Sequence, residues 1–155
     1  MTQVLSGETK VNEQQVQTLH IERELVIDAP PEIVFDSIFE EIEAFTGMGK
    51  TPMGMKIERW PGGRWFRDLG EGVGHLWGHV QVIKPPTLVE FCGPLMMSYP
   101  ALSHVQYRVM SEGTKSRLKF VHRAMGLLDP EHAKGVQQGW GMMLEAMKVR
   151  AEGKK

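Results

Sequence analysis

The C-terminal part of the chain has the pattern of one long amphipathic helix, and this helix is the strongest constraint on the fold. Asp129, Pro130 and Glu131 form a typical helix start, with a capping side chain, a proline in the first turn and an acidic residue that complements the helix dipole. Large apolar residues then recur at steps of four, three and four: Val136, Trp140, Met143 and Met147. Such a stripe must be buried, so the rest of the chain has to supply a surface for it.

The preceding residues predict that surface to be an antiparallel sheet. Apolar and polar residues alternate between Leu19 and Ile27, which indicates a half-buried strand, although Arg23 interrupts the apolar face. A short helix, from about Ile33 to Glu43, is expected to be capped by Asp28 or a neighbour. Turn residues then separate further strand pairs, which we expect at 55–60 with 64–69, 75–83 with 88–91, and 102–111 with 116–123.

The predicted order is therefore strand, helix, about six antiparallel strands and a long helix, which is an α+β fold. Strands joined by short turns form a meander, and the apolar face of a curved meander needs a cover. We expect the C-terminal helix to provide this cover, with an apolar pocket enclosed between the helix and the sheet.

Length and composition are those of an ordinary globular domain. The 155 residues suit one domain, expected over 19–151 after a flexible arm at 1–18. Lys and Arg total 18 against 19 Asp and Glu, which argues against a nucleic-acid-binding protein. The single Cys92 excludes an intramolecular disulfide, and the sequence shows neither a signal peptide nor a membrane span, so we expect a cytoplasmic protein.

Several short segments along the chain carry a family resemblance. They are 27–35 (IDAPPEIVF), 61–65 (PGGRW), 78–86 (GHVQVIKPP), 88–91 (LVEF), and Gly139-Trp140 with Leu144. Their order and spacing, over about Leu19 to Val149, resemble the START-like or Bet v 1-like (SRPBCC) superfamily, and within it the branch of the C-terminal domain of the activator of Hsp90 ATPase. The resemblance implies a helix-grip fold, in which a curved antiparallel sheet wraps around a long C-terminal helix. Family members often carry a Trp just after the first helix, where this chain has residues 45–48 (FTGM).

The candidate ligand-binding residues are large side chains expected to face the interior. Aromatic rings can line a cavity, and ligand pockets are mainly apolar with a few placed polar groups. Core packing is the alternative interpretation for each of them, and also for many of the 11 methionines. The predicted set is Trp65, Trp77, Tyr107, Phe120, His122, Trp140, Met143 and Met147. The alternation of their strands does not settle which way Trp65 and Trp77 point.

Two motifs resemble binding sites, one for phosphate and one for a metal ion, but neither has the structural context that such a site requires. Residues 44–51 nearly match a phosphate-binding P-loop, but Ala44 replaces the first glycine and a helix precedes the loop instead of a strand. His75 and His79 would share a metal on a helix, whereas on a strand they lie about 13 Å apart. We therefore predict no metal and no cofactor.

His122 is the best candidate for acid–base chemistry, because it shares the inward face of its strand with Leu118 and Phe120. A structural histidine with a hydrogen-bonding partner is the favoured interpretation, so no catalytic residue is assigned. Ser103 and His104 are adjacent on a strand and face opposite sides, which prevents them from acting together as nucleophile and base.

A row of basic residues is expected on the outer surface of the last strand. Arg117, Lys119 and Arg123 alternate with the apolar positions, and Lys115 precedes them. Such a row suits an acidic partner, or it keeps the sheet soluble and protects an edge.

The sequence thus predicts a domain that binds a small apolar molecule, lipid- or polyketide-like, between sheet and helix. The alternative, implied by the resemblance alone, is a co-chaperone-like domain that contacts a chaperone or another protein through its charged outer sheet or the loop at Met96-Met97. A third hypothesis is an enzyme of the cyclase or dehydratase kind, with His122 as its acid or base.

Overall fold

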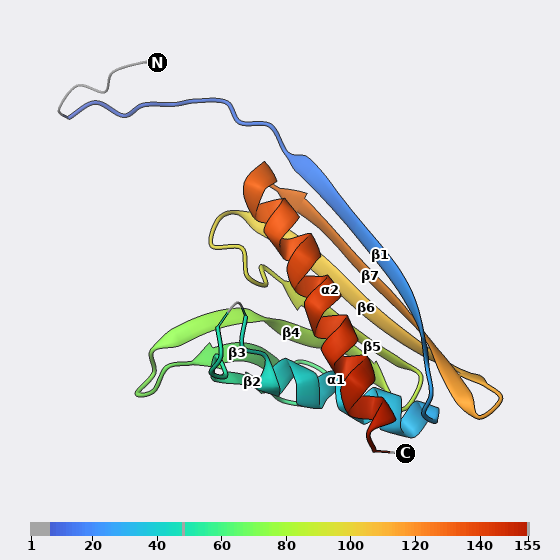
Figure 1. The fold of residues 1–155 in the computed structure, drawn as a ribbon. Helices are drawn as coiled ribbons and strands as arrows, with labels where there is room; N and C mark the ends of the chain where they lie inside the picture. Colours follow the sequence, from blue (N-terminus) through green and yellow to red (C-terminus); the bar gives the residue numbers. More distant parts are fainter. Residues whose placement is uncertain (1–6, 48, 155) are drawn as a thin grey trace.

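The computed structural model describes residues 7–47 and 49–154 (Figure 1). These residues form the predicted succession of one strand, one helix, six strands and a long helix. The elements are β1 (Gln17–Ile27), α1 (Pro31–Ala44), β2 (Met55–Ile57), β3 (Arg64–Asp68), β4 (Gly74–Lys84), β5 (Leu88–Gly93), β6 (Ala101–Glu112), β7 (Lys115–Gly126) and α2 (Pro130–Glu152). The α+β helix-grip fold is confirmed.

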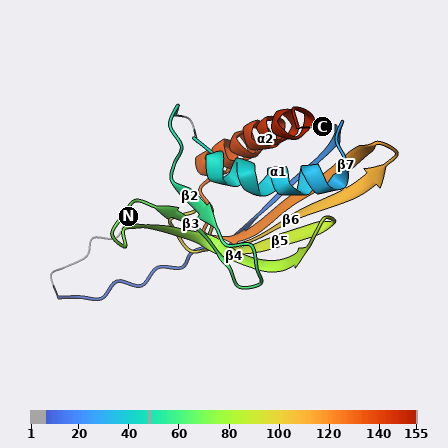
Figure 2. The same ribbon diagram turned by 90° about the horizontal axis from the view of Figure 1, so that it is seen from below.

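All seven strands belong to one antiparallel sheet with the order β1-β7-β6-β5-β4-β3-β2. Strands β2 to β7 follow one another as the expected meander. β1 pairs along its whole length with β7, from Gln17 opposite Gly126 to Ile27 opposite Ser116, so the first and last strands lie side by side. Both helices lie on the same face of this sheet (Figure 2).

The sheet curls because β4 carries two irregularities. Phe66 pairs with Leu76 while Trp65 pairs with Gly78, which leaves Trp77 as an extra residue in β4. The register of β4 shifts a second time, between Val80 and Val82, in its pairing with β5. Bulges bend a strand and increase its twist. At the bend Gly78 and Gly93 are both required, because a Cβ on Gly78 would lie 2.5 Å from the Cys92 carbonyl oxygen and one on Gly93 would lie 2.5 Å from Gly78 Cα.

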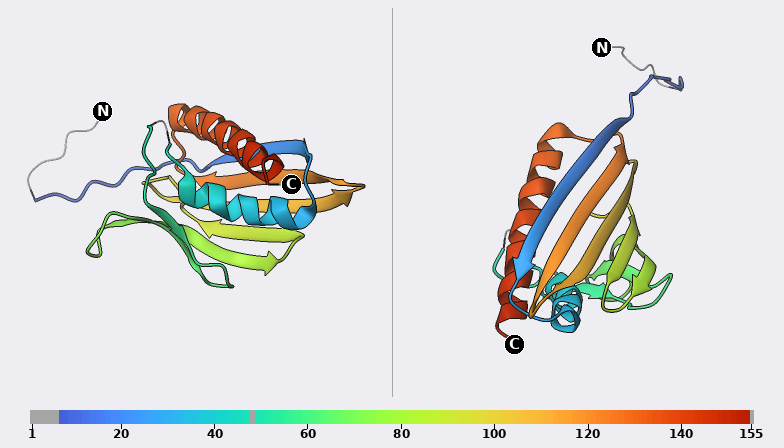
Figure 3. Two further views of the ribbon diagram at one scale, coloured as in Figure 1. Left: turned by 60° about the horizontal axis from the view of Figure 1, so that its bottom comes forward. Right: turned by 90° about the vertical axis from the view of Figure 1, so that its right-hand side faces the viewer.

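α2 crosses the concave face of the sheet, and α1 packs beside it (Figures 1 and 3). The predicted apolar stripe of α2 is buried along its whole length. Arg23, on the same face of β1, is the polar exception, since its guanidinium contacts the Gly141 carbonyl oxygen at 3.4 Å and forms an ion pair with Glu145. Arg23 therefore links α2 to β1, the edge strand of the sheet.

The two helix starts differ. At α2 the Asp129 side chain accepts a hydrogen bond from the Glu131 backbone N–H at 3.0 Å, as predicted. At α1 the N-cap residue is Pro30 and no side chain caps the helix, so the predicted cap by Asp28 or a neighbour is wrong. The Asp28 backbone N–H instead donates to Glu152 near the end of α2, at 2.9 Å.

The N-terminal stretch leads away from the body of the molecule (Figure 1). The first part of the predicted arm, 1–6, lies outside the described residues, and 7–16 contain neither helix nor strand. β1 begins at Gln17, two residues inside the predicted arm. Among the described helices, none is long and apolar enough to cross a membrane.

Candidate ligand-binding site

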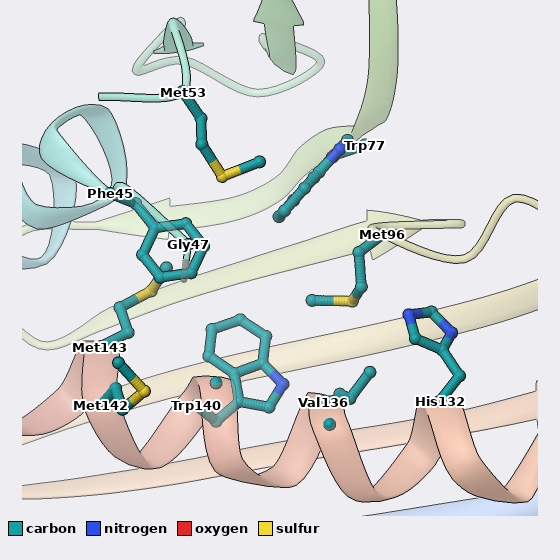
Figure 4. Close-up of a pocket in the computed structure, with 12 residues that line it drawn as sticks. Phe45, Gly47, Met53, Trp77, Met96, His132, Val136, Trp140, Met142 and Met143 are labelled. Carbon is teal, nitrogen blue, oxygen red and sulfur yellow. The ribbon is translucent and has the colours of Figure 1, made fainter. Parts of the chain in front are cut away.

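An apolar pocket of about 270 Å³ lies between the N-terminal half of α2 and the sheet (Figure 4). Trp77 and Met53 lie across the pocket from the α2 side chains Val136 and Trp140. The full lining is Phe45, Gly47, Met53, Trp77, Met96, His132, Gly135, Val136, Gly139, Trp140, Met142 and Met143. The pocket is thus built from the loop after α1, the start of β4, the loop after β5 and one face of α2.

Two glycines on α2 keep this space open. Gly135 and Gly139 are one helical turn apart, both line the pocket, and a Cβ built on either meets no atom within 4 Å. Glycine inside a helix is less favourable than alanine by about 1 kcal/mol. The helix therefore carries two unfavourable residues at positions that border the pocket, of which Gly139 is half-buried and Gly135 is exposed. Neither glycine is among the predicted site residues, although their spacing of four beside Val136 and Trp140 is a signal in the sequence.

The sheet side of the pocket depends on the bulge in β4. The extra residue at this bulge is Trp77, and its buried ring lies 5.6 Å from that of Trp65, centroid to centroid. Bulges redirect a side chain in this way. The strand alternation did not settle the direction of Trp77 because the register shift breaks that alternation.

The helix side of the pocket is held in place by Trp140. Its indole N–H donates to His122 Nδ1 at 2.9 Å, and its ring packs on Phe120 with centroids 4.6 Å apart. A ring fixed by one hydrogen bond and close packing loses little entropy when a ligand contacts it, so this wall is preorganised.

His122 is fully buried and uncharged. Since the indole N–H of Trp140 can only donate, His122 Nδ1 accepts and the proton of the neutral ring is on Nε2. Nε2 then donates to Ser103 Oγ at 3.0 Å. Burial lowers the pKa of His122 to about 4. His122 is therefore a structural histidine with both ring nitrogens engaged in hydrogen bonds, which is the interpretation that its sequence pattern favours.

This arrangement does not activate Ser103 as a nucleophile. A serine–histidine pair of that kind needs a ring nitrogen that accepts the serine proton, whereas here the ring donates to Ser103. Ser103 itself was missed as a partner of His122, because the contact depends on the register between β6 and β7, in which Ser103 faces Ala124.

The structure separates the eight predicted site residues into two groups. Trp77, Trp140 and Met143 line the pocket. Trp65, Tyr107, Phe120, His122 and Met147 are buried behind it in the core. Ligand binding by any of them stays a prediction. Lining residues outside the predicted set include Phe45, Met53 and His132, and His132 Nδ1 lies 2.8 Å from the Tyr99 hydroxyl oxygen.

The structure also describes the basic row, the possible metal ligands and most of the P-loop-like segment. Arg117 pairs with Glu112 and Glu24, and Lys119 pairs with Glu24 as well, so acidic neighbours neutralise these two members of the outer basic row. Within the described ranges no three His, Cys, Asp or Glu side chains are placed to hold a metal. The P-loop-like segment follows α1 as a loop, and one of its residues, Met48, lies outside the described residues.

The curved sheet around α2 places the chain among helix-grip proteins, and comparison with known families agrees. The chain belongs to the family described as Activator of Hsp90 ATPase homolog 1-like protein, whose model matches residues 28–152. This confirms the resemblance found in the sequence. No curated protein matches the chain.

Solved structures share the fold at low sequence identity. An uncharacterised protein from Rhizobium leguminosarum is 17% identical with a TM-score of 0.71, over 91% of this chain and 99% of that one. A protein from Rhizobium loti is 19% identical with a TM-score of 0.66, over 88% and 99%. The Aha1 dimer from Colwellia psychrerythraea is 14% identical with a TM-score of 0.60, over 86% and 96%. At these identities the likeness shows the fold alone.

Proposed function

We propose that this protein binds a compact apolar molecule in the pocket between α2 and β4. The observation that carries the proposal is the pair Gly135 and Gly139, which lowers helix stability and leaves an apolar cavity open. A domain selected only for stability would carry better helix formers at these two positions, because alanine or a larger apolar residue there would favour the helix and cover apolar surface.

The size and lining of the pocket favour a ring system over a long acyl chain. Its volume of about 270 Å³ lies near the lower end of the ~300–1,000 Å³ typical of ligand pockets. Two indoles and four thioethers, from Met53, Met96, Met142 and Met143, offer polarisable surface that suits an aromatic or polyketide-like ligand.

The test is a fluorescence titration with the neutral apolar probe N-phenyl-1-naphthylamine. Gly139→Phe should fill the cavity and weaken binding by at least about tenfold, because the ring occupies the space of the probe. Gly139→Ala is the matched control, since it adds one methyl group and leaves most of the volume. Equal affinities for the wild type and Gly139→Phe would refute the proposal.

A protein-interaction role is the second candidate, favoured by the outer face of the sheet. Leu102 and Met125 are direct neighbours across β6 and β7, and they are 60% and 54% exposed. Exposed apolar pairs of this kind mark contact surfaces when they are part of a larger patch. If the domain acts as a co-chaperone in the cytoplasm, Leu102→Glu should abolish its binding to a purified Hsp90-type ATPase in sedimentation experiments, whereas Gly139→Phe should not.

The geometry gives no comparable support for an enzyme. The acid–base candidate His122 has both ring nitrogens engaged with protein groups and contacts the pocket only through Trp140. A general acid or base has to reach the group whose proton it transfers.

A further inference from the structure

A second cavity adjoins the apolar pocket and has different chemistry. It measures about 480 Å³ and is lined on one side by Met53, Trp77 and Met96, which also line the first pocket. Its other side carries two nitrogen-containing side chains, Arg67 and His75. Two of the three shared side chains are methionines, whose flexible thioethers adapt readily to a ligand. The two cavities are therefore neighbouring compartments with one deformable wall.

Arg67 and His75 lie together because their strands place them opposite each other. They are direct partners in the pairing of β3 with β4. Arg67 is two residues from the buried Trp65 and therefore on the same, concave face of β3. Arg67 is also anchored, since its Nε–H donates to the Met53 carbonyl oxygen at 3.0 Å. An arginine has five N–H donors, so its terminal nitrogens remain available for a ligand.

Arg67 differs from the other cations of this hairpin by its lack of a carboxylate partner. Arg64 forms a double hydrogen bond with Glu58, and Lys56 pairs with Asp68 at 2.7 Å. Arg67 forms no ion pair with any residue that the structure describes, although it is half-buried. A half-buried guanidinium beside an apolar pocket, with no acid to neutralise it, is a binding group for an anion.

We infer that the ligand is an amphipathic anion, with a compact ring system in the apolar pocket and a carboxylate-type group bound by Arg67 and His75 in the second cavity. This inference rests on the proposed function and specifies its ligand class. The shared wall of Met53, Trp77 and Met96 lies where the ring system joins the anionic group. The single hydrogen bond from Arg67 to Met53 then links the charged end of the site to the loop that covers the apolar end.

Two fluorescent probes of one skeleton separate the two compartments. N-Phenyl-1-naphthylamine is neutral, and 8-anilinonaphthalene-1-sulfonate adds one sulfonate group to the same ring system. In wild-type protein we expect both to bind, and we expect only the sulfonate to bind more weakly as the NaCl concentration rises. Arg67→Gln should weaken binding of the sulfonate by about tenfold and change binding of the neutral probe far less, by no more than the loss of the Arg67–Met53 hydrogen bond causes.

Two further variants make the result specific. Arg67→Lys keeps the positive charge and should restore most of the affinity for the sulfonate. Arg108→Gln removes an exposed arginine on the opposite face of the sheet and should change neither probe. Equal loss of both probes in Arg67→Gln, or an unchanged sulfonate affinity, would overturn the inference while the apolar pocket stands. Failure of the pocket itself has a different signature, because wild-type protein would then not bind the neutral probe and Gly139→Phe would leave the sulfonate affinity unchanged.

Discussion

At the scale of single residues, His122 shows how a buried polar group can be fully satisfied and chemically inert. Its two ring nitrogens connect β7 to α2 through Trp140 and to β6 through Ser103. A proton on Nδ1 would face the indole N–H of Trp140, so the charged form loses a hydrogen bond in addition to its hydration. Burial, which lowers the pKa, and the hydrogen bond from Trp140 therefore both favour the neutral ring.

The depressed pKa of His122 predicts an acid-sensitive fold. Its pKa is about 4 in the folded protein and about 6.5 when unfolded, so the unfolded state binds the proton first as the pH falls. Stability is full above pH 6.5 and declines toward pH 4. Between pH 7 and pH 5 we expect His122 to account for a loss of about 2 kcal/mol in the free energy of unfolding.

Urea denaturation at several pH values measures this effect. His122→Asn keeps an acceptor for Trp140 but cannot titrate, so its free energy of unfolding should fall less between pH 7 and pH 5 than that of the wild type. The other five histidines are common to both proteins and cancel in the difference. Parallel pH profiles for the two proteins would contradict the assignment.

The partners of His122 mark the limit of residue-level prediction. Alternation along 116–123 correctly placed the ring on the inward face, and burial implied a partner. The identity of that partner depends on the alignment of Ser103 with Ala124, and of α2 with β7, which a strand pattern does not determine.

At the scale of elements, the glycines of α2 should respond differently to the same substitution. A Cβ on Gly139 meets open space, whereas one on Gly141 would lie 3.3 Å from Arg23 Nη1. Gly139→Ala should therefore raise the free energy of unfolding by up to about 1 kcal/mol, and Gly141→Ala by clearly less. Chemical denaturation measures the free energy of unfolding of both variants. Equal gains would show that the Arg23 side chain moves away from the new methyl group at no cost in stability.

Element boundaries could be predicted where the local pattern was complete. The end of β1 and the start of α2 follow from alternation and capping residues, and the last hairpin was predicted to within one residue except at the end of β7, which lies at Gly126 and not at Arg123. β2 is shorter than predicted, because after Ile57 the chain turns and the Gly63 N–H donates to the Trp60 carbonyl oxygen at 2.8 Å. The bulge at Trp77 was not predicted: Gly78 inside the strand pattern is a local signal for it, but the extra residue is defined only by the pairing of β4 with β3.

At the scale of the whole molecule, the pocket joins segments that are far apart in the chain. Phe45 and Met53 flank the loop after α1, Met96 belongs to the loop after β5, and Trp140 comes from α2 (Figure 4). The sequence predicted large side chains inside the curved sheet but not which of them border a space. Trp65 and Trp77 illustrate the difficulty, because only the second lines the pocket although the two rings are in contact.

A site that bridges separate segments should stabilise the whole fold when it is filled. A ligand at 100 times its dissociation constant adds about 2.7 kcal/mol to the free energy of unfolding. For a domain of this length that corresponds to a rise in Tm of roughly 5–10 °C. Differential scanning calorimetry of the wild type with saturating 8-anilinonaphthalene-1-sulfonate should show this rise, and Gly139→Phe should show little of it. An equal rise in both proteins would place the probe outside the pocket, with the exposed Leu102 and Met125 as the alternative site.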